Sequence, residues 1–160
     1  MSLSIEKLLT SQQHFTNFDV FSNVLSGYDM EVKQICRGSF SANLQQIQYG
    51  PISISRFTSR LRVEASGMPP PGMRTFGVPT TNCHPFVWRS KRTYGNTIQI
   101  YRPDTELAVN TDPIFEPNDI SLTEDDFNNL NYLWGFPDLA KLIQHREMVE
   151  CEPAEMHALR

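Results

Sequence analysis

The chain has 160 residues but few cysteines, few charges and no long apolar run. The number of cysteines is odd, and none of the three, Cys36, Cys83 and Cys151, forms a C-x-x-C pair. The sequence therefore predicts neither a disulfide framework nor a thiolate metal site. No segment approaches the roughly 18 apolar residues of a membrane helix, and Glu6 and Lys7 interrupt the start, where a signal peptide would be apolar. We therefore expect a cytoplasmic protein that does not enter a membrane.

The sequence also lacks the common motifs of metal binding, nucleotide binding and covalent catalysis. It contains no G-x-S-x-G elbow, no G-x-G-x-x-G loop and no Walker loop. The four histidines lie in separate segments, and no H-x-H pair would bring two of them to neighbouring strand positions. The sequence therefore predicts no catalytic residue, no metal and no cofactor.

Basic and acidic residues are unevenly distributed along the chain. The net charge is −4, which disfavours direct binding of duplex DNA. Residues 51–103 contain eight basic and one acidic residue, whereas residues 104–160 contain three basic and thirteen acidic ones. In one interpretation the acidic end pairs with the basic middle or both are solvated. In the other, some arginines face a cavity and receive an anionic ligand; the candidates are Arg56, Arg60, Arg62, Arg74 and Arg89.

Residues 30–122 show the period-two alternation of β-strands. The alternating runs lie around Val32, Leu44, Ile52, Trp88 and Ile98, and glycine or proline turns separate them. The segment 67–72, GMPPPG, is too rich in proline for a central strand and should form a loop at one mouth of the shell. An antiparallel meander or barrel is therefore expected here.

Helices are expected on both sides of this β-region. Residues 1–29 contain two short amphipathic patterns, one at Ile5, Leu8 and Leu9 and one ending at Gly27, and are interpreted as an arm and a lead-in helix. Thr123 followed by three acidic residues predicts the start of a helix pair over 123–149. Residues 150–160 are predicted to be a tail or linker.

An antiparallel barrel of about eight strands has room for one small ligand. No carboxylate pair is placed for acid-base work, so we expect the interior to bind rather than react. Either these side chains are ordinary core and surface residues, or they line a ligand site. The candidate ligand-binding residues are Phe40, Arg56, Arg74, Phe76, Trp88 and Tyr101.

Three stretches resemble the N-terminal sensor domain of AraC-type bacterial transcription regulators. They are QICRGSFSANL from Gln34, GPISISR from Gly50 and GMPPPGMRTFGVP from Gly67, and Tyr101-Arg102-Pro103 continues the likeness. The resemblance covers about residues 17 to 145. It implies a cupin-like antiparallel β-barrel, or jelly roll, followed by two C-terminal helices and preceded by a short N-terminal helix or arm.

The resemblance also implies a function. Such a domain binds a small-molecule effector and forms a homodimer, and a separate C-terminal domain reads DNA. Only 23 residues follow Pro137, too few for two helix-turn-helix units, so that domain is absent from this chain. The chain is then either a fragment of a longer regulator or a sensor that stands alone. The expected dimer seam comprises Leu130, Trp134, Leu139, Leu142 and Ile143, although the same side chains would equally cap their own barrel.

Two other functions remain open on the sequence. One is a metal-free cupin-type enzyme in which Tyr101 or His84 carries a proton. The other is an interaction domain whose barrel is filled and binds no ligand. Ligand binding without turnover would favour the sensor, turnover the enzyme, and neither the interaction domain.

Overall fold

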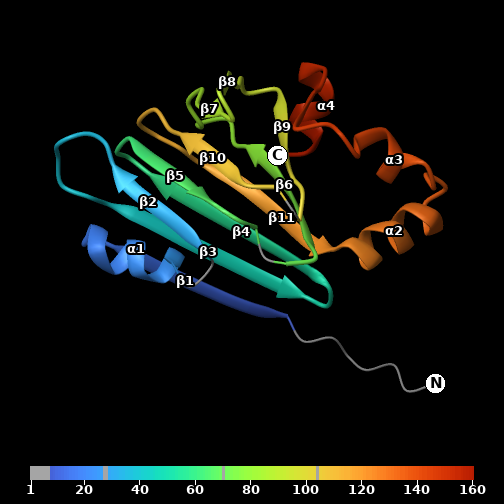
Figure 1. Ribbon diagram of the computed structural model, residues 1–160, viewed down its shortest axis with the longest axis horizontal. Helices are drawn as coiled ribbons and strands as arrows, with labels where there is room; N and C mark the ends of the chain where they lie inside the picture. The colour runs from blue at the N-terminus through green and yellow to red at the C-terminus, as the bar shows by residue number, and fades with distance from the viewer. Residues whose placement is uncertain (1–7, 27–28, 70, 104) are drawn as a thin grey trace.

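The computed structural model describes residues 8–26, 29–69, 71–103 and 105–160. Two antiparallel sheets face each other, and short helices lie at both ends of the chain (Figure 1). The larger sheet has, in spatial order, β1 (Leu9–Phe15), β3 (Ala42–Tyr49), β4 (Ile52–Ser59), β11 (Pro117–Thr123), β6 (Met73–Pro79), β9 (Thr97–Tyr101) and β12 (Met148–Glu150). The smaller sheet has β2 (Met30–Gln34), β5 (Val63–Gly67), β10 (Leu107–Asn110), β7 (Val87–Trp88) and β8 (Lys91–Arg92). The predicted fold class, a cupin-like β-shell with C-terminal helices, is confirmed.

The strands begin and end at the predicted turn residues. Gly50 has φ +54° in the turn between β3 and β4, a conformation that glycine adopts without strain. Gly67 ends β5, and a Cβ there would lie 2.2 Å from the Asp29 carbonyl oxygen, so a side chain is excluded sterically. The proline-rich segment after Gly67 connects β5 to β6 as predicted.

Large aromatic side chains join the two sheets. Phe86, Trp88 and Phe115 are buried and pack with Leu107 of the smaller sheet and with partly buried Phe57 of the larger one; other members of this cluster are Met30, Cys83, Tyr101, Val109 and Met148. A second cluster lies under helix α1 (Phe18–Ser26), where Phe21 stacks on Phe57 at 5.2 Å. The interior is therefore closely packed at these places.

Neighbouring residues on the strands of the larger sheet face opposite sides. Strand pairing places Ser55, Asp119, Gly77 and Gln99 side by side across β4, β11, β6 and β9. The next row along the same strands is apolar; it contains Ile54, Ile120, Phe76 and Ile100. Because side chains alternate along a strand, the polar row faces the interior and the apolar row faces outward.

Two of the three C-terminal helices in the described residues cover part of this outward face. Thr123 caps α2 (Glu124–Leu133), since its hydroxyl accepts from the Asp126 N–H at 3.1 Å, as the sequence predicts. Phe127 of α2 packs on Phe76 with ring centroids 5.5 Å apart. Ile143 of α3 (Leu139–Ile143) joins the same buried cluster as Ile100. Within the described residues, no helix is long and apolar enough to cross a membrane.

Two terminal segments differ from the sequence-based expectation. Residues 9–15, expected in an arm with helical character, form β1 and pair with β3 from Leu9↔Gln48 to Phe15↔Ala42; Ile5 lies outside the described residues. Residues 150–160 complete β12 and form α4 (Pro153–Ala158), whose Met156 is buried, so this segment is docked rather than a tail. Backbone pairing and one anchoring side chain outweigh the weak local patterns here.

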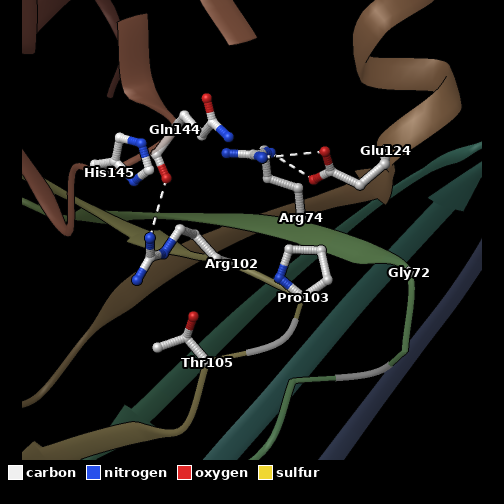
Figure 2. Close-up of a pocket in the computed structure, with 8 residues that line it drawn as sticks. All are labelled: Gly72, Arg74, Arg102, Pro103, Thr105, Glu124, Gln144 and His145. Atoms are coloured by element: carbon white, nitrogen blue, oxygen red, sulfur yellow. Dashed lines mark hydrogen bonds and ion pairs between the residues drawn. The ribbon is translucent and has the colours of Figure 1, made fainter. Parts of the chain in front are cut away.

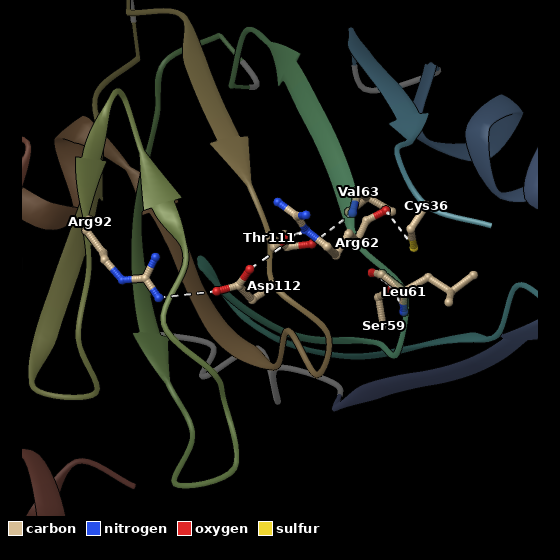
Figure 3. Close-up of polar contacts among 8 residues, drawn as sticks. All are labelled: Cys36, Ser59, Leu61, Arg62, Val63, Arg92, Thr111 and Asp112. Carbon is tan, nitrogen blue, oxygen red and sulfur yellow. Dashed lines mark hydrogen bonds and ion pairs between the residues drawn. The ribbon is translucent and has the colours of Figure 1, made fainter. Parts of the chain in front are cut away.

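Ion pairs join the basic middle of the chain to its acidic end. Arg62 and Arg92 both reach Asp112, at 3.7 and 3.3 Å, beside the Thr111 contacts with Val63 (Figure 3). Arg89 pairs with Glu147 at 3.2 Å. The intramolecular interpretation of the charge asymmetry therefore holds for these arginines.

Candidate functional site

The inward face of the larger sheet carries a polar patch, which we call the inner floor. It consists of two inward-facing rows two residues apart, Ser55, Asp119, Gly77 and Gln99 in one and Ser53, Ser121, Thr75 and Tyr101 in the other. Thr75 and Ser121 are joined by a hydrogen bond of 2.7 Å between their hydroxyls. Because most of the remaining interior is aromatic or aliphatic, the inner floor is where a ligand would find hydrogen-bonding groups.

Gly77 allows a close approach of polar groups at the centre of the inner floor. A Cβ at this position would lie 2.9 Å from the Tyr101 hydroxyl oxygen, 3.0 Å from Gln99 Oε1 and 3.2 Å from Asp119 Oδ1. Three oxygens, two from β9 and one from β11, therefore converge above one residue without a side chain. Any larger residue would displace them.

Two of the buried polar atoms near this point have no hydrogen-bond partner among the described residues. Gln99 is fully buried; its Nε2 donates to the Thr97 carbonyl at 2.9 Å, but its Oε1 is unpaired. Trp88 Nε1 is also buried and unpaired, although the indole stacks on the Tyr101 ring at 4.6 Å. Unpaired buried groups cost about 1–3 kcal/mol each, which a ligand with matching groups would recover.

Burial dominates the electrostatics of the inner floor. It raises the pKa of the Asp119 carboxyl from 3.8 to about 7, and the hydrogen bond from the Tyr101 hydroxyl, at 3.4 Å, opposes this only in part. Burial and the neighbouring Asp119 hold the pKa of Tyr101 well above its usual value. The floor thus pairs a carboxyl that titrates near neutrality with a hydroxyl that keeps its proton.

Cys83 lies beside this cluster. Its sulfur accepts from the Glu116 N–H at 3.2 Å, and burial raises the pKa of the thiol to about 11. The thiol therefore stays protonated at neutral pH and is a poor nucleophile. Among the described residues, no group of three His, Cys, Asp or Glu side chains is arranged to hold a metal ion.

The structure brings together only two of the six candidate ligand-binding residues. Trp88 and Tyr101 meet at the inner floor. Phe40 packs against Phe18 and Phe21 in the cluster under α1. Arg56 is exposed, and its Nε donates to Asn118 Oδ1 at 2.7 Å.

Arg74 and Phe76 lie on the outward face of the sheet. There Arg74 forms a bidentate pair with Glu124, and Phe76 packs under α2. The six residues therefore divide among the inner floor, the cluster under α1, and the exposed and covered parts of the outward face.

Asp119, Gln99 and Gly77 are the site residues that the sequence analysis missed. Asp119 and Gln99 look like ordinary surface positions in the alternating pattern, because the apolar neighbours Ile120, Ile98 and Ile100 suggest that the isoleucines face the core. The outward face is itself apolar and partly covered by helices. The polar residues of these strands therefore face the interior, which is the opposite of what the alternation suggests. The signal available was the run of inward-facing polar residues, Ser53, Ser55, Asp119 and Ser121, on paired strands.

The predicted dimer residues divide into two groups. Ile143 is buried, and Leu130 and Leu139 pack partly buried against the sheet, so these three cap their own shell. Trp134 and Leu142 are 67% and 69% exposed. Their exposed apolar neighbours are Tyr132, Leu133 and Phe136. We call these five exposed residues the α2–α3 apolar patch.

Comparison with known proteins identifies a similar fold but no family. No family model and no curated protein sequence matches the chain. Among solved structures, the chain is similar to the AraC-like transcriptional activator CuxR, with a TM-score of 0.53 and 12% identity. The match covers 76% of this chain and 52% of that one, so the chain spans about half of the activator's length. The two-sheet shell with its C-terminal helices is therefore similar in fold to part of that activator.

Proposed function

We propose that this chain is the effector-sensing and dimerisation domain of an AraC-type transcription regulator, working in the cytoplasm and without catalytic activity. The observation that supports this most directly is the fold similarity to an AraC-like activator over three quarters of the chain. DNA would be read by a separate domain. The acidic net charge is consistent with a chain that does not itself bind DNA.

The inner floor is the proposed effector site. It offers hydroxyl, amide and carboxyl groups beside the stacked rings of Trp88 and Tyr101, which suits a small polar molecule with several hydrogen-bonding groups. Asp119 lies in β11, and β11 runs directly into the N-cap of α2 at Thr123. An effector that binds one placement of β11 better than another would therefore shift the position of α2.

The α2–α3 apolar patch is the proposed dimer contact. Five large apolar side chains within eleven residues are each at least 63% exposed, which is costly on an isolated domain. Leu142→Glu should yield a monomer when molar mass is measured by light scattering. Leu159→Glu, at a residue 55% exposed in α4's C-cap, is the matched control and should leave the mass unchanged. A folded Leu142→Glu variant that stays dimeric would remove this patch from the interface.

A screen of small polar compounds by thermal unfolding tests the effector site. A true effector at 100 times its dissociation constant should stabilise the chain by about 2.7 kcal/mol. Asp119→Ala should lose most of that gain, while Arg56→Gln, on the outward face, should keep it. A stabilising compound that binds Asp119→Ala as well as the parent would place the effector elsewhere.

The interaction domain with a filled shell is the second candidate. It is favoured by the close packing of Phe86 against Phe115, at 4.9 Å, and of Trp88 against Tyr101. A screen in which no compound binds, together with a stable dimer, would support it. For the enzyme alternative, Tyr101 contacts Asp119 whereas His84 is exposed; conversion of a bound compound in the same screen would support that function.

A further inference from the structure

A cleft of about 430 Å³ opens on the outward side of the larger sheet, where β6 begins, β9 ends and α3 ends (Figure 2). Its walls include Arg74, Arg102, Thr105, Glu124, Gln144 and His145. Arg74 lies three residues from Gly77 on the same strand and therefore faces away from the inner floor. The cleft is thus separate from the proposed effector site.

Arg74 is the most deeply buried charge of this cleft. Its side chain is only 7% exposed, and its Nε and Nη2 donate to the two Glu124 carboxylate oxygens at 2.6 and 3.0 Å. The guanidinium also lies 5.1 Å from the centre of the Phe127 ring. The third nitrogen, Nη1, is buried and has no hydrogen-bond partner among the described residues.

Arg102 supplies a second incompletely paired guanidinium from another strand end. Its Nη1 donates to the Gln144 carbonyl oxygen at 3.0 Å, while its Nε is buried and unpaired within the described chain. Among the described lining residues there are therefore two guanidiniums and one carboxylate, and His145 is exposed at the rim. These described residues thus present an excess of positive charge and two buried N–H donors without a partner.

We propose that this cleft binds a small molecule through a phosphate group. A phosphate oxygen accepts from Arg74 Nη1 and another from Arg102, which pairs both donors without breaking the Arg74–Glu124 contact. Guanidinium groups match phosphate geometry closely, and the phosphate's several terminal oxygens suit donors that arrive from two strands. The cleft volume leaves room for the rest of a small phosphate ester. Thr105 and His145 are the groups available to it at the rim.

Isothermal titration of the full chain at constant ionic strength tests the proposal, with inorganic phosphate, glycerol 3-phosphate and acetate as probes. We expect saturable binding of both phosphate probes and weaker binding of acetate. Arg102→Gln should weaken glycerol 3-phosphate binding by about tenfold or more, as for loss of a charged hydrogen bond. Arg56→Gln removes the same charge from the same face of the sheet outside the cleft and should bind as the parent does.

His145→Gln provides a second test that does not touch a buried residue, and it should weaken phosphate binding by a smaller factor. The proposal is overturned if the parent chain shows no saturable phosphate binding, or if folded Arg102→Gln and His145→Gln both bind as the parent does. Acetate binding as tight as phosphate binding would overturn the assignment to phosphate. Neither outcome affects the inner floor, whose ligand is sought by a separate screen.

Discussion

Strand β6 separates two buried ionisable groups that the protein treats in opposite ways. On its outward side, Arg74 is locked in a bidentate pair with Glu124 and covered by the Phe127 ring. On its inward side, Asp119 lies close to Gly77 with one long hydrogen bond from Tyr101, and it forms no ion pair with any described residue. Both groups belong to the same sheet, and Arg74 lies only three residues from Gly77 along β6.

The surroundings of these two groups differ in whether an oppositely charged partner is present, and this decides how each group contributes to the fold. In a paired buried charge, each partner stabilises the charged form of the other. A buried carboxyl without a cation changes its state near neutral pH instead, since burial disfavours its charge. The outward pair therefore helps to fix α2 on the sheet, and the inner floor is where we propose a response to a ligand or to pH.

The largest effect is expected from removing the aromatic cover of the inner floor. Trp88→Ala should lower the free energy of unfolding by about 3–5 kcal/mol, because Trp88 is 1% exposed and its removal leaves a cavity between the sheets. Tyr94→Ala, at a residue 57% exposed, should change it by less than about 0.5 kcal/mol. Urea unfolding measures both. Equal losses in the two variants would mean that the shell is not packed through Trp88.

Breaking the outward pair should have the next largest effect. Arg74→Met leaves the Glu124 carboxylate, 34% exposed, without its partner and should cost about 2 kcal/mol, less than for a fully buried pair. Arg56→Met removes an exposed arginine of the same sheet and should cost less than about 0.5 kcal/mol. If the two variants unfold at the same urea concentration, the Arg74–Glu124 pair does not hold α2 in place.

The inner floor should make stability depend on pH. The folded Asp119 holds its proton up to a pKa of about 7, whereas the unfolded carboxyl loses it near 3.8. Between these values the unfolded state binds fewer protons, so Asp119 lowers stability as pH rises, by up to about 1.4 kcal/mol per pH unit.

Asp119→Asn should remove this contribution. Urea unfolding of the parent and of Asp119→Asn at pH 5, 6, 7 and 8 gives the difference directly, and the variant should gain relative to the parent as pH rises to about 7. Arg56→Gln serves as a control with a parent-like profile. A constant difference between the parent and Asp119→Asn across this range would show that Asp119 ionises normally in the folded chain.

The last expected effect is on the reactivity, and not the stability, of the thiol beside the inner floor. With its pKa raised to about 11, Cys83 should react with a disulfide reagent at pH 8 more slowly than a free cysteine, by about a hundredfold from its thiolate fraction. Reaction kinetics of a variant in which Cys36 and Cys151 are replaced by serine measure it. A rate equal to that of free cysteine would mean that Cys83 is solvated.

The sequence predicted the β-shell and the helix pair because their signals are local. Turn residues such as Gly50 and Gly67 set the strand boundaries. Thr123 and the three acidic residues after it set the start of α2. The resemblance to AraC-type sensors agreed with the fold found. By contrast, β1 and α4 depend on pairing with distant strands and on the burial of Met156, which no local pattern reveals.

The candidate site was only half predicted, through Trp88 and Tyr101. Large aromatic residues can be recognised as candidate core or ligand-binding residues from the sequence. Asp119, Gln99 and Gly77 belong to the site only because strand pairing brings them together. A strand with isoleucine and serine in alternation has two possible orientations. Here helices α2 and α3 cover part of the isoleucine face, so the polar residues turn inward.

The amino-acid sequence determined that this chain alternates short strands with glycine and proline turns, that it ends in capped helices, and that its charges separate along its length. Those features depend on backbone preferences and on residues close together in the chain. Which face of the larger sheet became the interior, and which arginines kept an unpaired N–H, depended on contacts between residues dozens of positions apart. The period-two pattern of the sequence shows only that neighbouring side chains face opposite sides of the sheet. The packing of sheets and helices decides which of the two sides becomes the interior.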